Sequence, residues 1–94
     1  MSQGSNRGIV TVLGLDQIGI IAWTSGRLAD YKVNILDISQ TIVNNYFTMI
    51  MVVDFSASEL DLSELSSTLE QEGLARGLQI KVQHEDIFRF MHRI

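Results

Sequence analysis

Few side chains of this sequence are spaced in a way that could support catalysis or metal binding. Gly14 and Gly19 have the glycine spacing of a phosphate-binding loop, but two isoleucines follow where that loop needs Lys and then Ser or Thr. The two histidines, His84 and His92, are too few for a metal site, which needs three or four convergent ligands. The absence of Cys excludes disulfides, thiolate metal sites and cysteine nucleophiles. We therefore predict no catalytic residue, no metal and no cofactor, and expect a protein that is not an enzyme.

The segment Asp16-Gln17-Ile18-Gly19 follows an apolar run and has residue types suited to a small ligand. We expect Asp16 to cap a helix that opens here, because its carboxylate can accept from the free N–H groups of the first turn. Those N–H groups and the positive end of the helix suit a bound carboxylate. Gly19 has no Cβ, so a ligand or a neighbouring chain can approach its backbone closely. The alternative is that Asp16 only caps the helix and Gly19 only eases packing.

A second polar group lies in the strand predicted over residues 33–43. Asn34 offers a donor and an acceptor to the polar end of an amino acid, and Asp37 could meet its ammonium group. The alternative is that Asn34 only starts the strand.

Length and composition describe one globular domain. The chain has 94 residues, of which 46% are hydrophobic and 19% charged. We expect residues 1–7 to form a disordered lead-in and residues 8–94 a single domain. The first 53 residues carry three acids and three bases, so the net charge of −4 lies in the remainder. We expect this acidic part to be a solvated face; the alternative is that it recruits a basic partner.

The charge and the apolar runs also limit partners and location. Sequence-independent binding of nucleic acid needs a basic surface, and this chain has a net charge of −4. We therefore expect no direct nucleic-acid partner. No apolar run reaches the roughly 18–20 residues that span a bilayer, and residues 1–7 lack the apolar segment of a secretory signal. We therefore expect a cytoplasmic protein with no membrane partner.

Hydrophobic patterning predicts six elements in the order β-α-β-β-α-β. The helices begin at Asp16 and at a capping box formed by Asp61 and Glu64, and Asn44-Asn45 forms a hairpin turn because Asn tolerates positive φ. Two right-handed crossovers then give an α+β, ferredoxin-like sandwich, with both helices on one face of a four-stranded antiparallel sheet in the order 4-1-3-2. The strands are expected at residues 8–15, 33–43, 46–54 and 78–84.

The first helix has two apolar stripes, of which one is expected to face the core and the other a second copy of the chain. Residues 33–43 form a sheet edge, and pairing this strand with its two-fold mate would close the edge into an eight-stranded sheet. The expected core stripe is Ile18, Ile21, Ala22, Ser25, Leu28 and Ala29. The expected dimer interface is Ile20, Trp23, Arg27 and Tyr31.

The C-terminal stretch places four apolar residues on one helical face: Ile87, Phe90, Met91 and Ile94. We expect it to pack on its own subunit; the alternative is an arm that docks on a partner subunit.

Two stretches of the sequence resemble the ACT domain, a family of small amino-acid-sensing regulatory modules of βαββαβ topology. They are Val12-x-Gly14-x-Asp16-x-x-Gly19-Ile20-Ile21-Ala22 and Asn34-Ile35-x-Asp37-Ile38-Ser39-Gln40-Thr41. With Tyr46-Phe47-Thr48-Met49, the second stretch is similar to stand-alone bacterial single-domain ACT proteins and to the glycine-cleavage-system repressor. The resemblance covers about residues 8–91.

The resemblance implies a non-catalytic regulatory module that binds a small amino acid at a homodimer interface and signals to a metabolic or transcriptional partner protein. The ligand would lie between the turn after the first strand of one subunit and the start of the second strand of its partner. Many ACT domains have Arg-Pro or a similar pair where this chain has Gln17-Ile18, which bears on ligand specificity. The candidate ligand-binding residues are Asp16, Gln17, Ile18, Gly19, Asn34, Ile35 and Asp37.

Two other families share this topology and are the alternatives. An acylphosphatase-like hydrolase places an Arg in the first turn to hold phosphate, but residues 14–19 contain no Arg or Lys. An RNA-recognition-like module needs exposed aromatic and basic residues on its strands. Tyr46 and Phe47 are present, but residues 33–54 contain no Arg or Lys.

Overall fold

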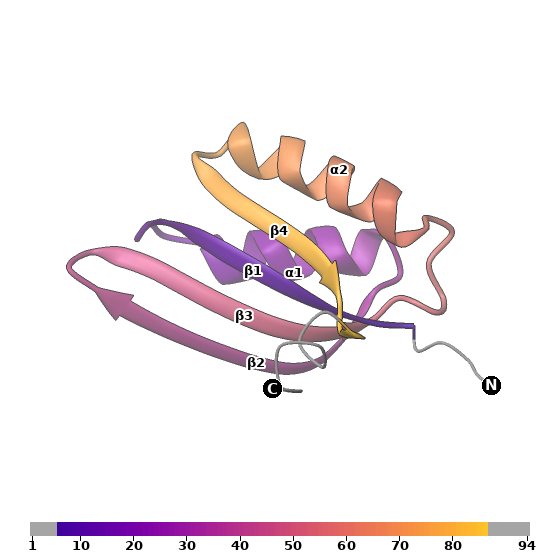
Figure 1. Ribbon diagram of the computed structural model, residues 1–94. Coiled ribbons are helices and arrows are strands. Elements are labelled where there is room, and N and C mark those ends of the chain that lie inside the picture. Colours follow the sequence, from indigo (N-terminus) through magenta and orange to yellow (C-terminus); the bar gives the residue numbers. More distant parts are fainter. Residues whose placement is uncertain (1–5, 87–94) are drawn as a thin grey trace.

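The computed structural model describes residues 6–86, and its six elements follow in the predicted order (Figure 1). Each predicted strand agrees with the observed one to within a residue at either end. The C-terminal stretch with Ile87, Phe90, Met91 and Ile94 lies outside the described residues, as does the first part of the expected lead-in. The elements are β1 (Arg7–Leu15), α1 (Ile20–Asp30), β2 (Asn34–Val43), β3 (Tyr46–Asp54), α2 (Leu62–Leu74) and β4 (Leu78–His84).

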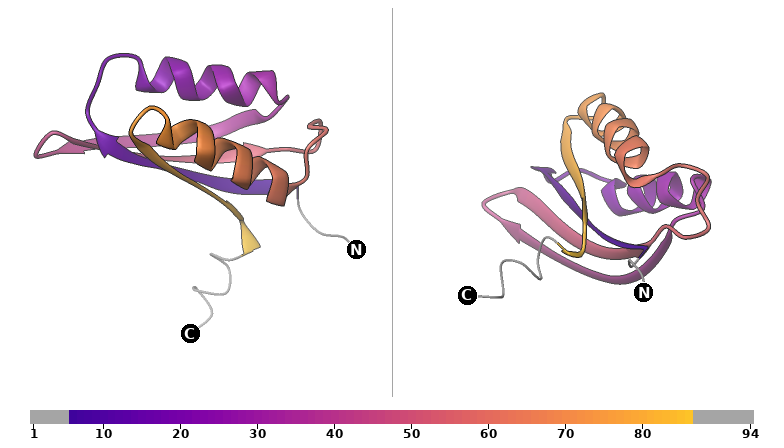
Figure 2. Two further views of the ribbon diagram at one scale, coloured as in Figure 1. Left: turned by 90° about the horizontal axis from the view of Figure 1, so that it is seen from above. Right: turned by 45° about the vertical axis from the view of Figure 1, so that its right-hand side comes forward.

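The four strands form one sheet in the order β2-β3-β1-β4, and each neighbouring pair is antiparallel. Both helices cover the same face, and within residues 6–86 no helix covers the other face, which we call the open face (Figure 2). The hairpin between β2 and β3 turns at Asn44 and Asn45, whose φ values of 51° and 68° are the positive angles that Asn tolerates. The predicted ferredoxin-like sandwich and its strand order are therefore confirmed.

The hydrophobic core lies between the sheet and the helices. Along β1, Val10 and Val12 are buried against the helices, whereas Leu13 and Leu15 of the same strand are 42% and 59% exposed. This alternation follows from the two-residue period of a strand. Fourteen buried residues make up the core: Val10, Val12, Ile20, Leu28, Val33, Phe47, Met49, Met51, Val53, Leu65, Leu69, Leu78, Ile80 and Val82.

Strand β2 is far more exposed than its sequence pattern suggests. Its residues alternate between the two faces of the sheet, since Ile38 and Ile42 pair with the core residues Met51 and Phe47. Every residue of β2 except the half-buried Ile35 is nevertheless exposed. The physical reason is its place at the edge of the sheet, where β3 is its only neighbouring strand within residues 6–86. Strand β2 is therefore an exposed edge strand in the single chain.

The core stripe predicted for α1 is confirmed at Leu28 and wrong at its N-terminal end, where Ile20 of the other predicted stripe is buried. The buried residues of this helix are Ile20, Thr24 and Leu28, at the four-residue spacing of one helical face. The expected core residues include Ile18, which precedes the helix and is 100% exposed, and Ile21, which is 39% exposed. Both stripes carry apolar side chains, so periodicity alone does not show which stripe is buried. Contact with the sheet determines it.

The second helix begins as predicted. The Glu64 N–H donates to Asp61 Oδ1 at 2.8 Å, and the Asp61 N–H donates back to Glu64 Oε1 at 3.0 Å. This capping box satisfies two backbone donors that the first turn of a helix leaves free. It fixes where α2 starts, so Leu65 and Leu69 point into the core.

Candidate functional site

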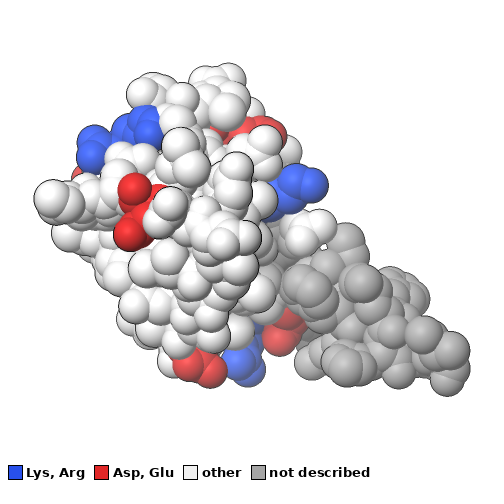
Figure 3. Space-filling view, turned by 90° about the vertical axis from the view of Figure 1, so that its left-hand side faces the viewer, with Lys and Arg blue, Asp and Glu red and all other residues white. Residues whose placement is uncertain are grey.

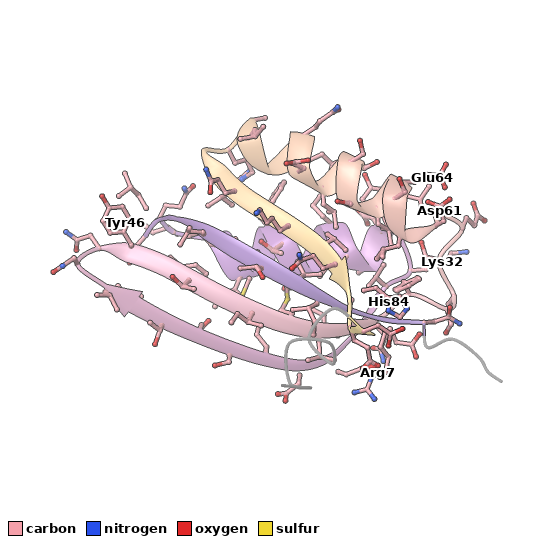
Figure 4. All side chains as sticks on the ribbon, in the orientation of Figure 1. Arg7, Lys32, Tyr46, Asp61, Glu64 and His84 are labelled. Carbon is pink, nitrogen blue, oxygen red and sulfur yellow. The ribbon has the colours of Figure 1, made fainter. Side chains whose placement is uncertain are left out.

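The predicted ligand loop, residues 16–19, lies at the end of the sheet where β1 ends and the hairpin connects β2 to β3. The Asp16 N–H donates to the Asn45 carbonyl at 2.7 Å and so ties the loop to the hairpin turn. Tyr46 marks this end in Figure 4, whereas Arg7 and His84 mark the opposite end. Much of the surface at this end is uncharged (Figure 3).

The helix after this loop is capped by Gly19 and not by Asp16, so that prediction was wrong. Gly19 has a φ of 86°, a left-handed conformation that brings the chain into the helix and that residues with a Cβ rarely adopt. The helix therefore begins at Ile20, and Asp16 lies too early in the chain to be its N-cap residue. No side chain caps this end. The N–H groups of the first turn, near Ile20, are thus available to an added acceptor.

Arg76 and Trp23 also border this loop, and Arg76 was not predicted from the sequence. Gln17 Nε2 donates to the Arg76 carbonyl at 3.4 Å, across 59 positions of sequence. The Arg76 guanidinium lies 4.9 Å from the centre of the Trp23 ring, a cation–π contact. Arg76 therefore puts a cation beside the start of α1. No sequence signal pointed to it, because the loop before β4 meets the loop after β1 only in the folded chain.

The other predicted ligand residues lie at the far end of the sheet. Asn34 pairs with Asp54, whereas Val43, at the other end of β2, pairs with Tyr46. Ten strand residues extend about 30 Å, at about 3.3 Å per residue. One chain therefore does not bring Asn34, Ile35 and Asp37 to the same small ligand as residues 16–19.

These three residues also differ in the face of the sheet that they occupy. Ile35 pairs with the buried Val53 and lies on the helix side, whereas Asp37 pairs with Val52 on the open side. The register shifts between Ile35 and Asp37, which marks a β-bulge. The Asp37 carboxylate accepts the backbone N–H of Ile38 at 2.9 Å, so it already has one partner.

The residues expected at a dimer interface pack within their own chain instead. Ile20 is 4% exposed and belongs to the core, and Trp23 and Tyr31 pack against that core. Arg27 donates to both carboxylate oxygens of Glu72 on α2, at 3.0 Å each, and Tyr31 OH donates to Glu72 at 2.6 Å. This stripe connects the two helices within one chain, so its apolar character alone does not require a second copy, and the predicted interface stays a prediction.

Charge and hydrogen bonding in the Arg27–Tyr31–Glu72 cluster shift two pKa values in opposite directions. The hydrogen bonds from Arg27 hold the pKa of Glu72 below its ordinary value. The hydrogen bond to Glu72 raises the pKa of Tyr31, because an ionised phenolate could not donate it. Both groups therefore keep their usual charge near neutral pH, and the cluster is a structural connection between the helices.

Residues 6–86 contain no group of three or more His, Cys, Asp and Glu side chains placed to hold a metal ion. Within the same residues no helix has the length and apolar character needed to cross a membrane.

Comparison with known proteins identifies the family. The model of the ACT domain matches residues 7–83 of this chain. The chain belongs to the ACT domain family. It is 49% identical over 90 residues to a UPF0237 protein of Methanosarcina acetivorans, covering 96% of this chain and 98% of the relative. It is 52% identical over 89 residues to a UPF0237 protein of Methanocaldococcus jannaschii, covering 95% and 99%.

Solved structures place this ACT domain among proteins of the same fold. An ACT domain protein from Streptococcus pneumoniae superposes with a TM-score of 0.80 at 39% identity, covering 90% of this chain and 96% of that one. A structure assigned as a glycine cleavage system transcriptional repressor gives a TM-score of 0.71 at 22% identity, covering 82% of this chain and 44% of that one. The second likeness shows the shared fold. ACT domains are typically regulatory, ligand-binding modules, and this chain has that architecture.

Proposed function

We propose that two copies of this ACT domain pair through the edges of β2 and bind a small amino acid at each end of the seam. Antiparallel pairing about a two-fold axis reverses the second strand. Asn34 of the second copy then lies beside Val43 of the first, at the end of the sheet that holds residues 16–19. The observation that supports this most is the placement of the two half-sites at opposite ends of one exposed edge strand.

The groups at this junction suit the two ends of an amino acid. The uncapped first turn of α1 offers N–H donors to a carboxylate, with the Arg76 guanidinium near it. Asn34 of the second copy offers polar contacts, and Ile35, on the helix side, offers an apolar surface to the ligand side chain. We expect a dissociation constant between micromolar and millimolar, or about −4 to −8 kcal/mol.

The proposed role is regulatory and non-catalytic. A ligand held by two copies binds the dimer and not the separate chains, so ligand concentration controls the dimer population by mass action. The dimer would then signal to a metabolic or transcriptional partner protein in the cytoplasm. Among the residues described, the candidate site contains no pair of side chains arranged as a nucleophile and its base.

Calorimetry against the twenty amino acids, combined with sedimentation, tests this proposal. At least one amino acid should release heat and shift the protein toward the mass of two chains. Asn34→Ala should weaken binding about tenfold, because a polar partner worth about 1–1.5 kcal/mol is lost. Gln79→Ala is the matched control, since Gln79 is an exposed amide on β4 at the opposite edge, and it should leave binding unchanged.

Two results would contradict the proposal. The first is the absence of both heat and stabilisation with all twenty amino acids. The second is tight binding by a protein that remains a single chain of 10.6 kDa at every ligand concentration, since one chain holds only half of the site.

A further inference from the structure

Strand β4 forms the second edge of the sheet, opposite β2. Within residues 6–86 no strand pairs with its outer side, so alternate N–H and C=O groups of residues 78–83 lie along an open edge. Helix α2 runs beside this edge (Figures 1 and 2). An open strand edge beside a helix is the arrangement into which an extended peptide can add as a further strand.

A groove separates α2 from this edge and widens toward the start of the helix. The two elements touch at Gly73, where an added Cβ would lie 2.7 Å from Ile80 Cδ1. Away from this contact, a hollow of about 590 Å³ opens between Leu62, Ser63, Ser66, Ser67, Glu70 and Val82. Two smaller hollows of about 230 and 290 Å³ continue along β4 and share Glu70 with it. We call these three together the α2–β4 groove.

The lining of the α2–β4 groove combines core residues of β4 with serines and one acid of α2. Ile80 and Val82 of β4 are 1% and 8% exposed and belong to the core. Glu70 lines all three hollows. Lys81 also borders the groove, but it pairs with Thr11, which places its side chain on the open face of the sheet. Glu70 is therefore the charge that α2 presents to a peptide lying in the groove.

The charge of α2 is not balanced within the helix. Leu62–Leu74 contains three acids and no base, and the chain as a whole has a net charge of −4. Glu72 already binds Arg27, whereas Glu70 is exposed. A partner that fits this helix is basic, because an acidic one would meet like charge.

We propose that the α2–β4 groove binds an extended, basic segment of a partner protein, which adds to β4 as an outer strand. Main-chain hydrogen bonds to the edge of β4 would supply most of the affinity, and alternate side chains would supply specificity. A Lys or Arg that points toward α2 can lay its aliphatic stem on Val82 and place its charge at Glu70. The other side chains would point to the open side of the sheet.

The same segment has less reason to bind at β2. β2 is the edge used in the proposed dimer, so a peptide added there would compete with the second copy of the chain. The two edges lie on opposite sides of the sheet, so a dimer would present two α2–β4 grooves at its outer ends. This inference does not rest on amino-acid binding. The α2–β4 groove would be the surface through which a regulatory module contacts its partner protein.

Amide NMR of the full chain tests the proposal with a defined probe, the peptide acetyl-Lys-Val-Lys-Val-Lys-Val-Lys-amide. We expect saturable shifts confined to α2 and β4, with a dissociation constant between micromolar and millimolar. A peptide with Glu in place of Lys should bind at least tenfold more weakly. A peptide N-methylated at alternate residues, on the side that would face β4, should also lose binding, because it cannot form the strand hydrogen bonds.

Two exposed acids provide the matched variants. Glu70→Lys should weaken binding of the basic peptide at least tenfold, and Glu59→Lys, which makes the same change outside the groove, should weaken it less than twofold. Equal effects of both variants, or retained binding of the N-methylated peptide, would reduce the contact to general charge attraction and overturn the proposal. Shifts along β2, or no saturable shifts, would also overturn it.

Discussion

Glu72 shows how a single carboxylate can join two helices that are far apart in sequence. It accepts two hydrogen bonds from Arg27 and one from Tyr31, and its side chain is 29% exposed. Glu72→Gln removes the charge and disturbs the bidentate pair, so we expect a loss of about 1–2 kcal/mol in the free energy of unfolding. Urea unfolding measures this loss. The control is Glu70→Gln on the same helix, which should change stability by less than about 0.5 kcal/mol.

The same cluster sets a pH dependence with a defined sign. The pKa of Glu72 is lower in the folded chain than in the unfolded chain, so its contribution is complete above the ordinary value of 4.5. That contribution is lost as the pH falls below 4.5 through the folded pKa. The pKa of Tyr31 is raised, so its contribution is lost as the pH rises above 10.0. Urea midpoints of wild type and Glu72→Gln should therefore converge in acid; a constant difference down to pH 2 would contradict this.

Thr24 has a buried hydroxyl group that forms no hydrogen bond within residues 6–86. Its side chain is 1% exposed, and Oγ1 has no hydrogen-bond partner within the described part of the chain. Burial of a hydroxyl without a partner is costly, so Thr24→Val should raise the free energy of unfolding by about 1 kcal/mol. Thr24→Ser keeps the hydroxyl and loses a methyl group, so it should lower stability instead. Thermal unfolding of the two variants would contradict the prediction if both were less stable than wild type.

At the scale of the elements, two glycines in helices should respond in opposite ways to the same change. A Cβ at Gly73 of α2 would lie 2.7 and 2.8 Å from two carbons of Ile80 and 3.1 Å from the Leu78 carbonyl. A Cβ at Gly26 of α1 would have nothing within 4 Å. Gly73→Ala should therefore cost about 1–3 kcal/mol by forcing α2 away from β4. Gly26→Ala should stabilise by about 0.5–1 kcal/mol through helix propensity.

Chemical denaturation distinguishes packing from propensity in this pair. If both alanine variants gained stability, the close packing of α2 on β4 would not limit this part of the fold. The α2–β4 groove would then have a less rigid boundary than the structure indicates.

At the scale of the whole molecule, two isoleucines of similar exposure make it possible to test association through the β2 edge and through the open face separately. Ile38 on β2 is 44% exposed and Ile50 on β3 is 46% exposed, so either can become Lys at similar cost to the single chain. In the proposed dimer, Ile38→Lys brings two like charges near the two-fold axis, which is unfavourable across paired strands. Association should weaken at least tenfold, as measured by sedimentation equilibrium.

Ile50→Lys should leave the association unchanged, because the open face takes no part in the seam. Loss of association in Ile50→Lys alone would assign the contact to the open face and contradict pairing through β2.

The extent of each element could be predicted because its causes are local. The two asparagines at 44 and 45 turn the hairpin through their own backbone angles, and the capping box of Asp61 and Glu64 involves four consecutive residues. Apolar runs and two-residue alternation predicted the strands, and the short loops allowed few topologies for six such elements. The match of the motifs to the ACT domain rests on the same local spacing.

The tertiary structure decided what depends on residues far apart in sequence. Both stripes of α1 are apolar, and contact with the sheet buried Ile20 while Ile21 remained exposed. Arg76 came beside Gln17 only when two distant loops met. Residues 16–19 and Asn34 lie at opposite ends of β2 in one chain, and only the strand register shows this separation. The local spacing of residue types determines which backbone conformation each segment adopts. The distance between segments depends on how the strands assemble into the sheet.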